Sequence, residues 1–182
     1  TVTDGNCCSD FASFYVSEPV AVHASAFFTP VSCNGGSDGT ASVSASGGDD
    51  NFSYVWCNGQ TGATATGLSV GICAVTVTDG NGCFDVASVD VTEPLAVQAT
   101  TDFTAVSCSG GSDGTATAMA SGGNGNFSYL WCDGQTTATA TGLPVGMCTV
   151  TVTDDNGCFD IIDIEMTEPA PIELKAAAFW CE

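Results

Sequence analysis

Cysteine is the residue type with which this chain can do chemistry, because eleven cysteines occur in 182 residues. Eight of them form two sets of four that lie 75 residues apart: Cys33, Cys57, Cys73 and Cys83, then Cys108, Cys132, Cys148 and Cys158. They lack the histidine partners and the spacing of a metal site, so they indicate disulfide formation in an oxidising compartment. The sequence therefore predicts an exported protein, located outside the cell or on its surface.

Four cysteines in each set allow three disulfide connectivities. Cys33 and Cys83 both lie at expected strand ends, and we expect both ends at the same pole of a domain. Cys57 and Cys73 lie at the end and the start of strands that we expect to be neighbours, although alternation points Cys57 away from Cys73 unless the strand bulges. The expected pairing is Cys33–Cys83 and Cys57–Cys73, repeated as Cys108–Cys158 and Cys132–Cys148.

Three further cysteines, Cys7, Cys8 and Cys181, lie outside these two sets. Residues 1–8 read TVTDGNCC and match TVTDGNGC at 76–83, so Cys8 takes the place of Cys83. Cys181 arrives two residues before the place that corresponds to Cys108. We expect one of two partners for these thiols: sequence outside this chain, or a second copy joined head to tail through a Cys181–Cys8 bond.

Two acidic turns, DGNG at 79–82 and DDNG at 154–157, read like the start of a calcium-binding loop. Calcium takes six to eight oxygen ligands, and no glutamate follows at the spacing of an EF-type loop. We therefore favour hairpin turns that are closed by their aspartate side chains. Ca²⁺ is the alternative and the one cofactor considered, and its candidate ligands are Asp79, Asn81, Asp154 and Asn156.

Two asparagines and two tryptophans could carry or bind sugar. Asn51 and Asn126 each begin an Asn-Phe-Ser acceptor for N-glycosylation. Trp56 and Trp131 could stack on sugar rings, but aromatic residues that alternate along a strand more often belong to a core. Surface glycans are therefore the weaker candidate for a partner.

The charge of the chain excludes several classes of function. The formal net charge is −20, arginine is absent, and Lys175 and His23 are the only lysine and histidine. Nucleic-acid binding needs clustered Lys and Arg, and an acidic surface is repelled by anionic membranes. General acid–base catalysis has almost no groups to use. We predict no nucleic-acid binding, no membrane insertion, no catalytic residue and no enzyme.

Apolar and polar residues alternate with a period of two, which predicts strands rather than helices. NFSYVW at 51–56, for example, places all three of its aromatic residues on one face. The expected strands of one copy are 21–28, 39–46, 51–56, 63–68, 72–79 and 84–91, with Gly-rich turns between them. Strands of this number and length predict an all-β fold of tandem Ig-like sandwiches.

Self-comparison aligns residues 33–94 with residues 108–169 at a constant offset of 75 and without a gap. A Glu-Pro pair ends each copy, at 93–94 and 168–169, and occurs once more at 18–19. The expected domains are the C-terminal part of a preceding repeat (1–19), a first repeat (20–94), a second repeat (95–169), and the first strand of a following repeat or a joining segment (170–182).

The shared pattern, CNGGSDGTA followed by FSYVWCNG, ATATGL, VTVTDGNGC and VTEP, resembles the SprB repeat. This resemblance implies an Ig-like sandwich in a large surface protein, chiefly of Bacteroidota, with a role in adhesion. Repeats of that family usually carry two cysteines, at the places of Cys33 and Cys83, so Cys57 and Cys73 depart from the pattern. We expect a structural or adhesive repeat protein that forms a surface array or filament with copies of itself. The alternative is a glycan-binding surface module.

Overall fold

The computed structural model describes residues 1–174, which form strands, turns and loops without a helix. The strands of the first repeat are β3 (His23–Thr29), β4 (Gly39–Ser46), β5 (Ser53–Trp56), β6 (Thr64–Leu68), β7 (Gly71–Thr78) and β8 (Phe84–Val91). Those of the second repeat are β9 (Gln98–Thr104), β10 (Gly114–Ser121), β11 (Ser128–Trp131), β12 (Thr139–Leu143), β13 (Gly146–Thr153) and β14 (Phe159–Met166). A short hairpin, β1 (Val2–Thr3) and β2 (Ser9–Asp10), precedes them.

The strands form where the sequence alternates, and burial follows the same period. In β13 the side chains of Cys148, Val150 and Val152 are buried, while the intervening threonines are half-buried. Valine and threonine branch at Cβ, so both fit an extended backbone well. The pattern thus directs one face of each sheet inward and leaves the other toward solvent.

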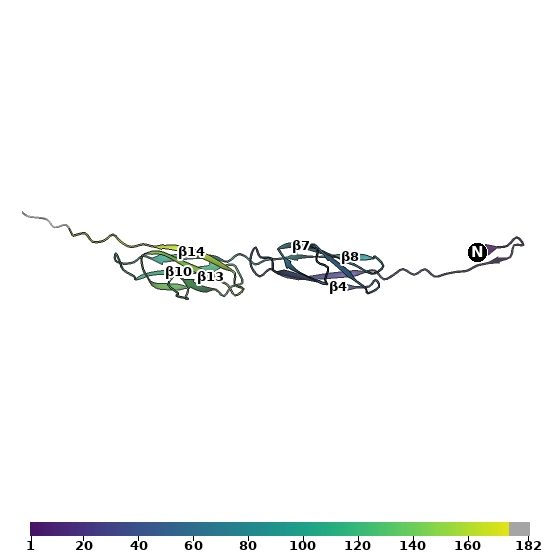
Figure 1. Cartoon of the computed structure of the whole chain (residues 1–182), viewed down its shortest axis with the longest axis horizontal. Coiled ribbons are helices and arrows are strands. Elements are labelled where there is room, and N and C mark those ends of the chain that lie inside the picture. Colours follow the sequence, from purple (N-terminus) through teal and green to yellow (C-terminus); the bar gives the residue numbers. More distant parts are fainter. Residues whose placement is uncertain (175–182) are drawn as a thin grey trace, which may run out of the picture. The chain divides into compact units, whose positions relative to one another are not determined.

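Each repeat consists of two three-stranded antiparallel sheets. The strand orders are β3-β4-β6 and β5-β7-β8 in the first repeat, and β12-β10-β9 and β11-β13-β14 in the second. Figure 1 labels β4, β7 and β8 in the first sandwich and β10, β13 and β14 in the second. Every adjacent pair can be antiparallel because tight turns and short loops connect the strands.

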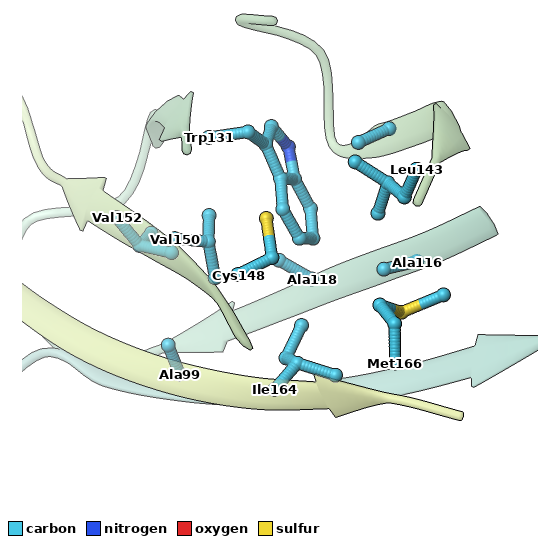
Figure 2. Close-up of a cluster of buried hydrophobic side chains, with 11 residues drawn as sticks. Ala99, Ala116, Ala118, Trp131, Leu143, Cys148, Val150, Val152, Ile164 and Met166 are labelled. Carbon is cyan, nitrogen blue, oxygen red and sulfur yellow. The ribbon is translucent and has the colours of Figure 1, made fainter. Parts of the chain in front are cut away.

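The two sheets of the second repeat share one core, in which small and large residues face each other (Figure 2). The sheet that contains β9 and β10 contributes Ala99, Ala116 and Ala118, whereas the other sheet contributes Trp131 and Met166 among its larger side chains. Trp131 is only 2% exposed, and its indole N–H donates to the carbonyl oxygen of Thr137 at 2.8 Å. The buried polar atom of the ring is therefore satisfied, as a core tryptophan requires.

The described chain divides into two compact units. The first contains residues 1–27, 42–65 and 73–89, and the second contains 28–41, 66–72 and the described residues from 90 onward. The second unit therefore combines the second repeat with the loop of the first repeat that carries Cys33. The all-β, disulfide-bonded sandwich fold predicted from the sequence is confirmed.

Candidate functional site

The loop that carries Cys33 connects β3 to β4, and two acidic side chains fix it. The Asp38 carboxylate accepts hydrogen bonds from the backbone N–H of Ser32, at 3.0 Å, and from the Ser32 hydroxyl. These two bonds, the hydroxyl first, hold the pKa of Asp38 below its usual value near 3.8. Glu93, of the Glu-Pro pair, accepts the N–H of Gly35 at 2.6 Å. The end of the repeat is thus tied to the loop, and the position of Cys33 is fixed.

The hairpin that carries Cys158 connects β13 to β14 and is organised by a buried carboxylate. One oxygen of Asp154 accepts the N–H groups of Asn156 and Cys158, both at 2.9 Å, and the other accepts the N–H of Asn124, also at 2.9 Å. The bond from Asn124 contributes most to a pKa below the usual value, and burial opposes it. Asp154 therefore acts as the closing group of a hairpin turn.

A disulfide joins this loop to this hairpin, and both of its cysteines belong to the second compact unit. Cys33 and Cys158 have a Cα–Cα distance of 5.5 Å and are 125 residues apart in the sequence. Next to the bond, the Asn156 side-chain amide donates to the backbone carbonyl oxygen of Ser32 at 3.2 Å. The bond therefore connects the early cysteine of one repeat to the late cysteine of the next.

This connection corrects the sequence prediction, in which Cys33–Cys83 and Cys108–Cys158 were paired. The N–H of Val31, beside Cys33, donates to the carbonyl oxygen of Thr92, so the loop lies at the C-terminal end of β8. Cys83 directly precedes the first residue of the same strand. Eight residues of strand separate the two ends by about 26 Å, whereas a disulfide needs Cα atoms less than about 7 Å apart. The two cysteines thus lie at opposite poles, and Cys83 and Cys108 are exposed free thiols.

The other predicted pairs, Cys57–Cys73 and Cys132–Cys148, are present in the structure, each with a Cα–Cα distance of 5.3 Å. No bulge is needed in β5, because Cys57 is the first residue of the turn after it. Its N–H donates to the carbonyl oxygen of Ala74 at 2.9 Å, which directs the side chain to the buried Cys73. A loop of 16 residues closed in this way stabilises the fold by roughly 3 kcal/mol on the chain-entropy model.

The N-terminal hairpin repeats the geometry of the hairpin at Asp154. One oxygen of Asp4 accepts the N–H groups of Asn6 and Cys8, both at 2.9 Å. Cys7 has a positive φ of 66°, at the place where Gly157 has 84°. Cys7 and Cys8 are free and exposed, and the remaining candidate for joining copies, Cys181, lies outside the described residues.

The candidate calcium ligands Asp79, Asn81, Asp154 and Asn156 lie in the two hairpin turns. Asp79 uses one oxygen, as Asp154 does, to accept the N–H groups of Asn81 and Cys83. Its other oxygen is buried and has no hydrogen-bond partner. Within residues 1–174, no three His, Cys, Asp or Glu side chains come together as they would around a metal ion. Calcium binding at these turns stays an untested alternative to the hairpin turns that the sequence favoured.

The residues predicted to contact or carry sugar separate into buried and exposed ones. Trp56 and Trp131 are each 2% exposed, so neither offers a ring face for stacking. Asn51 and Asn126 are exposed, and the Asn126 side chain donates to Asp155 at 2.7 Å. Glycosylation at these two asparagines stays a prediction.

Replacing Asp154 by asparagine should lower the thermal midpoint at neutral pH, because an amide cannot accept all three N–H bonds. The pKa of Asp154 is lowered in the fold, so its contribution is complete above the unfolded value near 3.8 and is lost as the pH falls through the folded value. Thermal unfolding between pH 7 and pH 2 should therefore show a smaller acid-induced decrease for Asp154→Asn than for the wild type. Asp102→Asn, an equal charge change at an exposed position of β9, should keep the wild-type slope.

Comparisons with known proteins find a family model and, among the solved structures, distantly similar chains. Residues 25–61 and 100–136 match the family model described as SprB repeat. No curated protein matches the chain. One matching solved structure, the amphioxus IgVJ-C2 molecule, is 13% identical, with 83% of this chain and 98% of that chain covered and a TM-score of 0.32. Residues 1–174 hold no helix with the length and apolarity that a membrane crossing requires. The chain is therefore similar to the SprB repeat family, with one matched region in each of its two sandwiches.

Proposed function

We propose that this chain is a structural and adhesive segment of an extracellular surface protein, in which repeats extend and brace a surface array. The observation that carries the proposal is the Cys33–Cys158 disulfide. A disulfide inside one domain stabilises that domain alone. A disulfide between consecutive repeats also limits how far the repeats can separate, which is useful to a protein that must hold together outside the cell.

The composition supports this location and this role. Disulfides persist in oxidising surroundings, and small domains with modest cores depend on them for stability. The net charge of −20 keeps the surface hydrated and prevents close association with anionic polymers. The proposed role is not enzymatic, because with a single histidine, a single lysine and no arginine the chain offers few groups for general acid–base catalysis.

The proposed organisation keeps the bounds expected from the sequence. Residues 20–94 and 95–169 are two repeats, residues 1–19 are the C-terminal part of a preceding repeat, and residues 170–182 are the first strand of a following repeat or a joining segment. The hairpin around Asp4 supports this assignment of the N-terminal part, because its hydrogen bonds match those of the two complete repeats. Glycan binding is not proposed, since both candidate tryptophans serve the core.

Surface shaving of intact producing cells tests this function. Trypsin has only one site in this chain, at Lys175, so a Glu-specific protease is used instead. Brief digestion with it should release peptides of this chain without cell lysis. After alkylation without reduction, mass spectrometry should find Cys33 linked to Cys158 in the released material. Peptides that appear only after lysis, with both thiols alkylated, would rule out an extracellular structural role. A cytoplasmic marker protein serves as the control for lysis.

A further inference from the structure

The Cys33–Cys158 bond shows how a loop of one repeat is linked to a hairpin of the next, and the free thiols of the chain can form the same kind of link. A loop of the type Ser32-Cys33 receives a hairpin of the type Asp154–Cys158, through one disulfide and one hydrogen bond from Asn156. The loop Ser107-Cys108 has the same sequence pattern, but Cys108 is free and exposed. The described chain therefore contains one loop of this type that has received no hairpin.

The vacant loop is already held in the receiving conformation. Asp113 accepts the N–H of Ser107 at 2.9 Å, as Asp38 does for Ser32. Glu168 accepts the N–H of Gly110 at 2.6 Å, as Glu93 does for Gly35. Docking on Cys108 thus requires no rearrangement of the loop. The conformational entropy of the loop is already lost when the repeat folds, so docking does not reduce it further.

Two hairpins with a free late cysteine could dock there, one ending at Cys83 and one ending at Cys8. They differ in one contact. In the complete repeats the first strand lies against the hairpin, because the N–H of Ala24 donates to Asp85 at 2.8 Å and the N–H of Ala99 donates to Asp160 at 2.9 Å. The hairpin at Cys83 therefore already has its first strand.

Among the described residues, no first strand lies against the hairpin at Cys8. Asp10 corresponds to Asp85 and Asp160, and one of its oxygens accepts the N–H of Phe11 at 2.8 Å, just as each of those aspartates bonds the residue after it. Its second oxygen has no partner among the described residues, and residues 1–21 are exposed throughout. This hairpin is thus folded but open on the side where a first strand would lie.

The segment after the Glu-Pro pair at 168–169 lies beside the vacant loop and corresponds in sequence to the segment that enters β9. Ile172 and Leu174 correspond by the 75-residue offset to Val97 and Ala99, which are 8% and 9% exposed, yet they are themselves 95% and 96% exposed. Ile172 also lines a cavity of about 420 Å³ beside Cys108. Among the described residues, this exposed apolar segment has no hairpin against it and the Cys8 hairpin has no first strand, so the two are complementary.

We propose that the Asp4–Cys8 hairpin of a second copy of this chain docks on the Ser107-Cys108 loop and is locked there by a Cys8–Cys108 disulfide. Asn6 then donates to the carbonyl oxygen of Ser107, as Asn156 donates to Ser32, and the N–H of Leu174 donates to the open oxygen of Asp10. The two thiols lose two protons and two electrons to an external disulfide such as oxidised glutathione, which is reduced to two thiols as the new S–S bond forms.

This docking deepens the proposed function, on which it rests for an oxidising location, and it gives head-to-tail association a specific site. It is an alternative to the Cys181–Cys8 bond, which was one of the two possibilities expected from the sequence. Because each copy carries one hairpin and one vacant loop, the contact is heterologous and can continue from copy to copy.

The test uses the full chain incubated with reduced and oxidised glutathione. Non-reducing electrophoresis should show a ladder of multimers, and peptide mapping should identify Cys8 linked to Cys108. Cys8→Ser and Cys108→Ser should each remain monomeric, whereas Cys83→Ser, the matched hairpin control, should keep the ladder. A mixture of Cys8→Ser with Cys108→Ser should give a heterodimer and nothing larger. Asn6→Ala should form multimers several-fold more slowly than the wild type.

Four results would overturn the proposal: a wild-type chain that stays monomeric, a Cys8–Cys108 bond found within monomers, a ladder linked by Cys83–Cys108, or one linked by Cys8–Cys181. None of them would remove the Cys33–Cys158 bond or the peptides released from intact cells. Failure of the docking is therefore distinguishable from failure of the proposed function.

Discussion

Pulling the oxidised chain from its two ends should extend it by about 320 Å less than the double variant Cys33→Ser/Cys158→Ser. The disulfide transmits tension directly from residue 33 to residue 158, so the 125-residue segment between them bears none of it. In the variant, the two 16-residue loops stay closed and subtract 32 residues, which leaves 93 residues to extend. An unfolded residue adds about 3.3–3.6 Å. Single-molecule force spectroscopy measures this difference in contour length.

Full reduction of the wild-type chain should give the largest extension under force. All three bonds then open, and the maximal extension should grow by about 430 Å relative to the oxidised chain. The double variant Cys83→Ser/Cys108→Ser is the matched control, because it removes two cysteines that bridge nothing within the chain. Equal extensions of the oxidised wild type and of Cys33→Ser/Cys158→Ser would show that the two repeats are not bridged.

Gly122→Ala should destabilise the second repeat by about 3–5 kcal/mol, the combined effect of a strained backbone and an overpacked contact. Gly122 has a φ of +77°, and a Cβ there would lie 1.9 Å from the carbonyl oxygen of Ala96. The next N–H in the turn, that of Gly123, donates to Leu95 at 2.9 Å, so the turn is bonded to the segment that enters β9 and cannot move away. Denaturant unfolding followed by tryptophan fluorescence measures the loss.

Gly134→Ala separates the backbone strain at a positive φ from the overpacked contact with Ala96. Gly134 has a φ of +88°, but a Cβ at that position would meet nothing within 4 Å. Its cost should therefore be the backbone term alone, about 1–2 kcal/mol. Hydrogen exchange would assign each loss to the second repeat. If Gly122→Ala cost no more than Gly134→Ala, the close approach of the turn to Ala96 would be contradicted.

The features that could be predicted from the sequence are those that depend on residues close together along the chain. Alternation placed the strands at 39–46 and 84–91 as β4 and β8 have them, because the inward face of a sheet must be apolar wherever the strand runs. The turn at 154–157 was predicted as a hairpin because aspartate closes such turns locally. Cys57–Cys73 was predictable since Cys57 follows one strand and Cys73 lies near the start of its neighbour.

The pairing of Cys33 could not be predicted in this way, because it depends on which end of the sandwich each cysteine occupies. The number and order of strands do not determine that. The sequence did carry one signal: Glu93 follows the last strand of the first repeat, and the structure bonds it to Gly35. That contact places the loop of Cys33 beside the exit of the repeat, and hence beside the entrance of the next one. The sequence alone does not predict this contact, because it does not show that the Gly35 N–H and the Glu93 carboxylate lie together.

The long span of the Cys33–Cys158 bond has a consequence for chemical and enzymatic damage. Exposed Gly-rich turns are the places where proteases cut folded proteins most readily, and most such turns of the two repeats lie between these two cysteines. A single break of the backbone anywhere in that interval leaves both fragments attached through sulfur. The chain can therefore be cleaved in its most exposed part and still remain covalently connected from its N-terminus to its C-terminus.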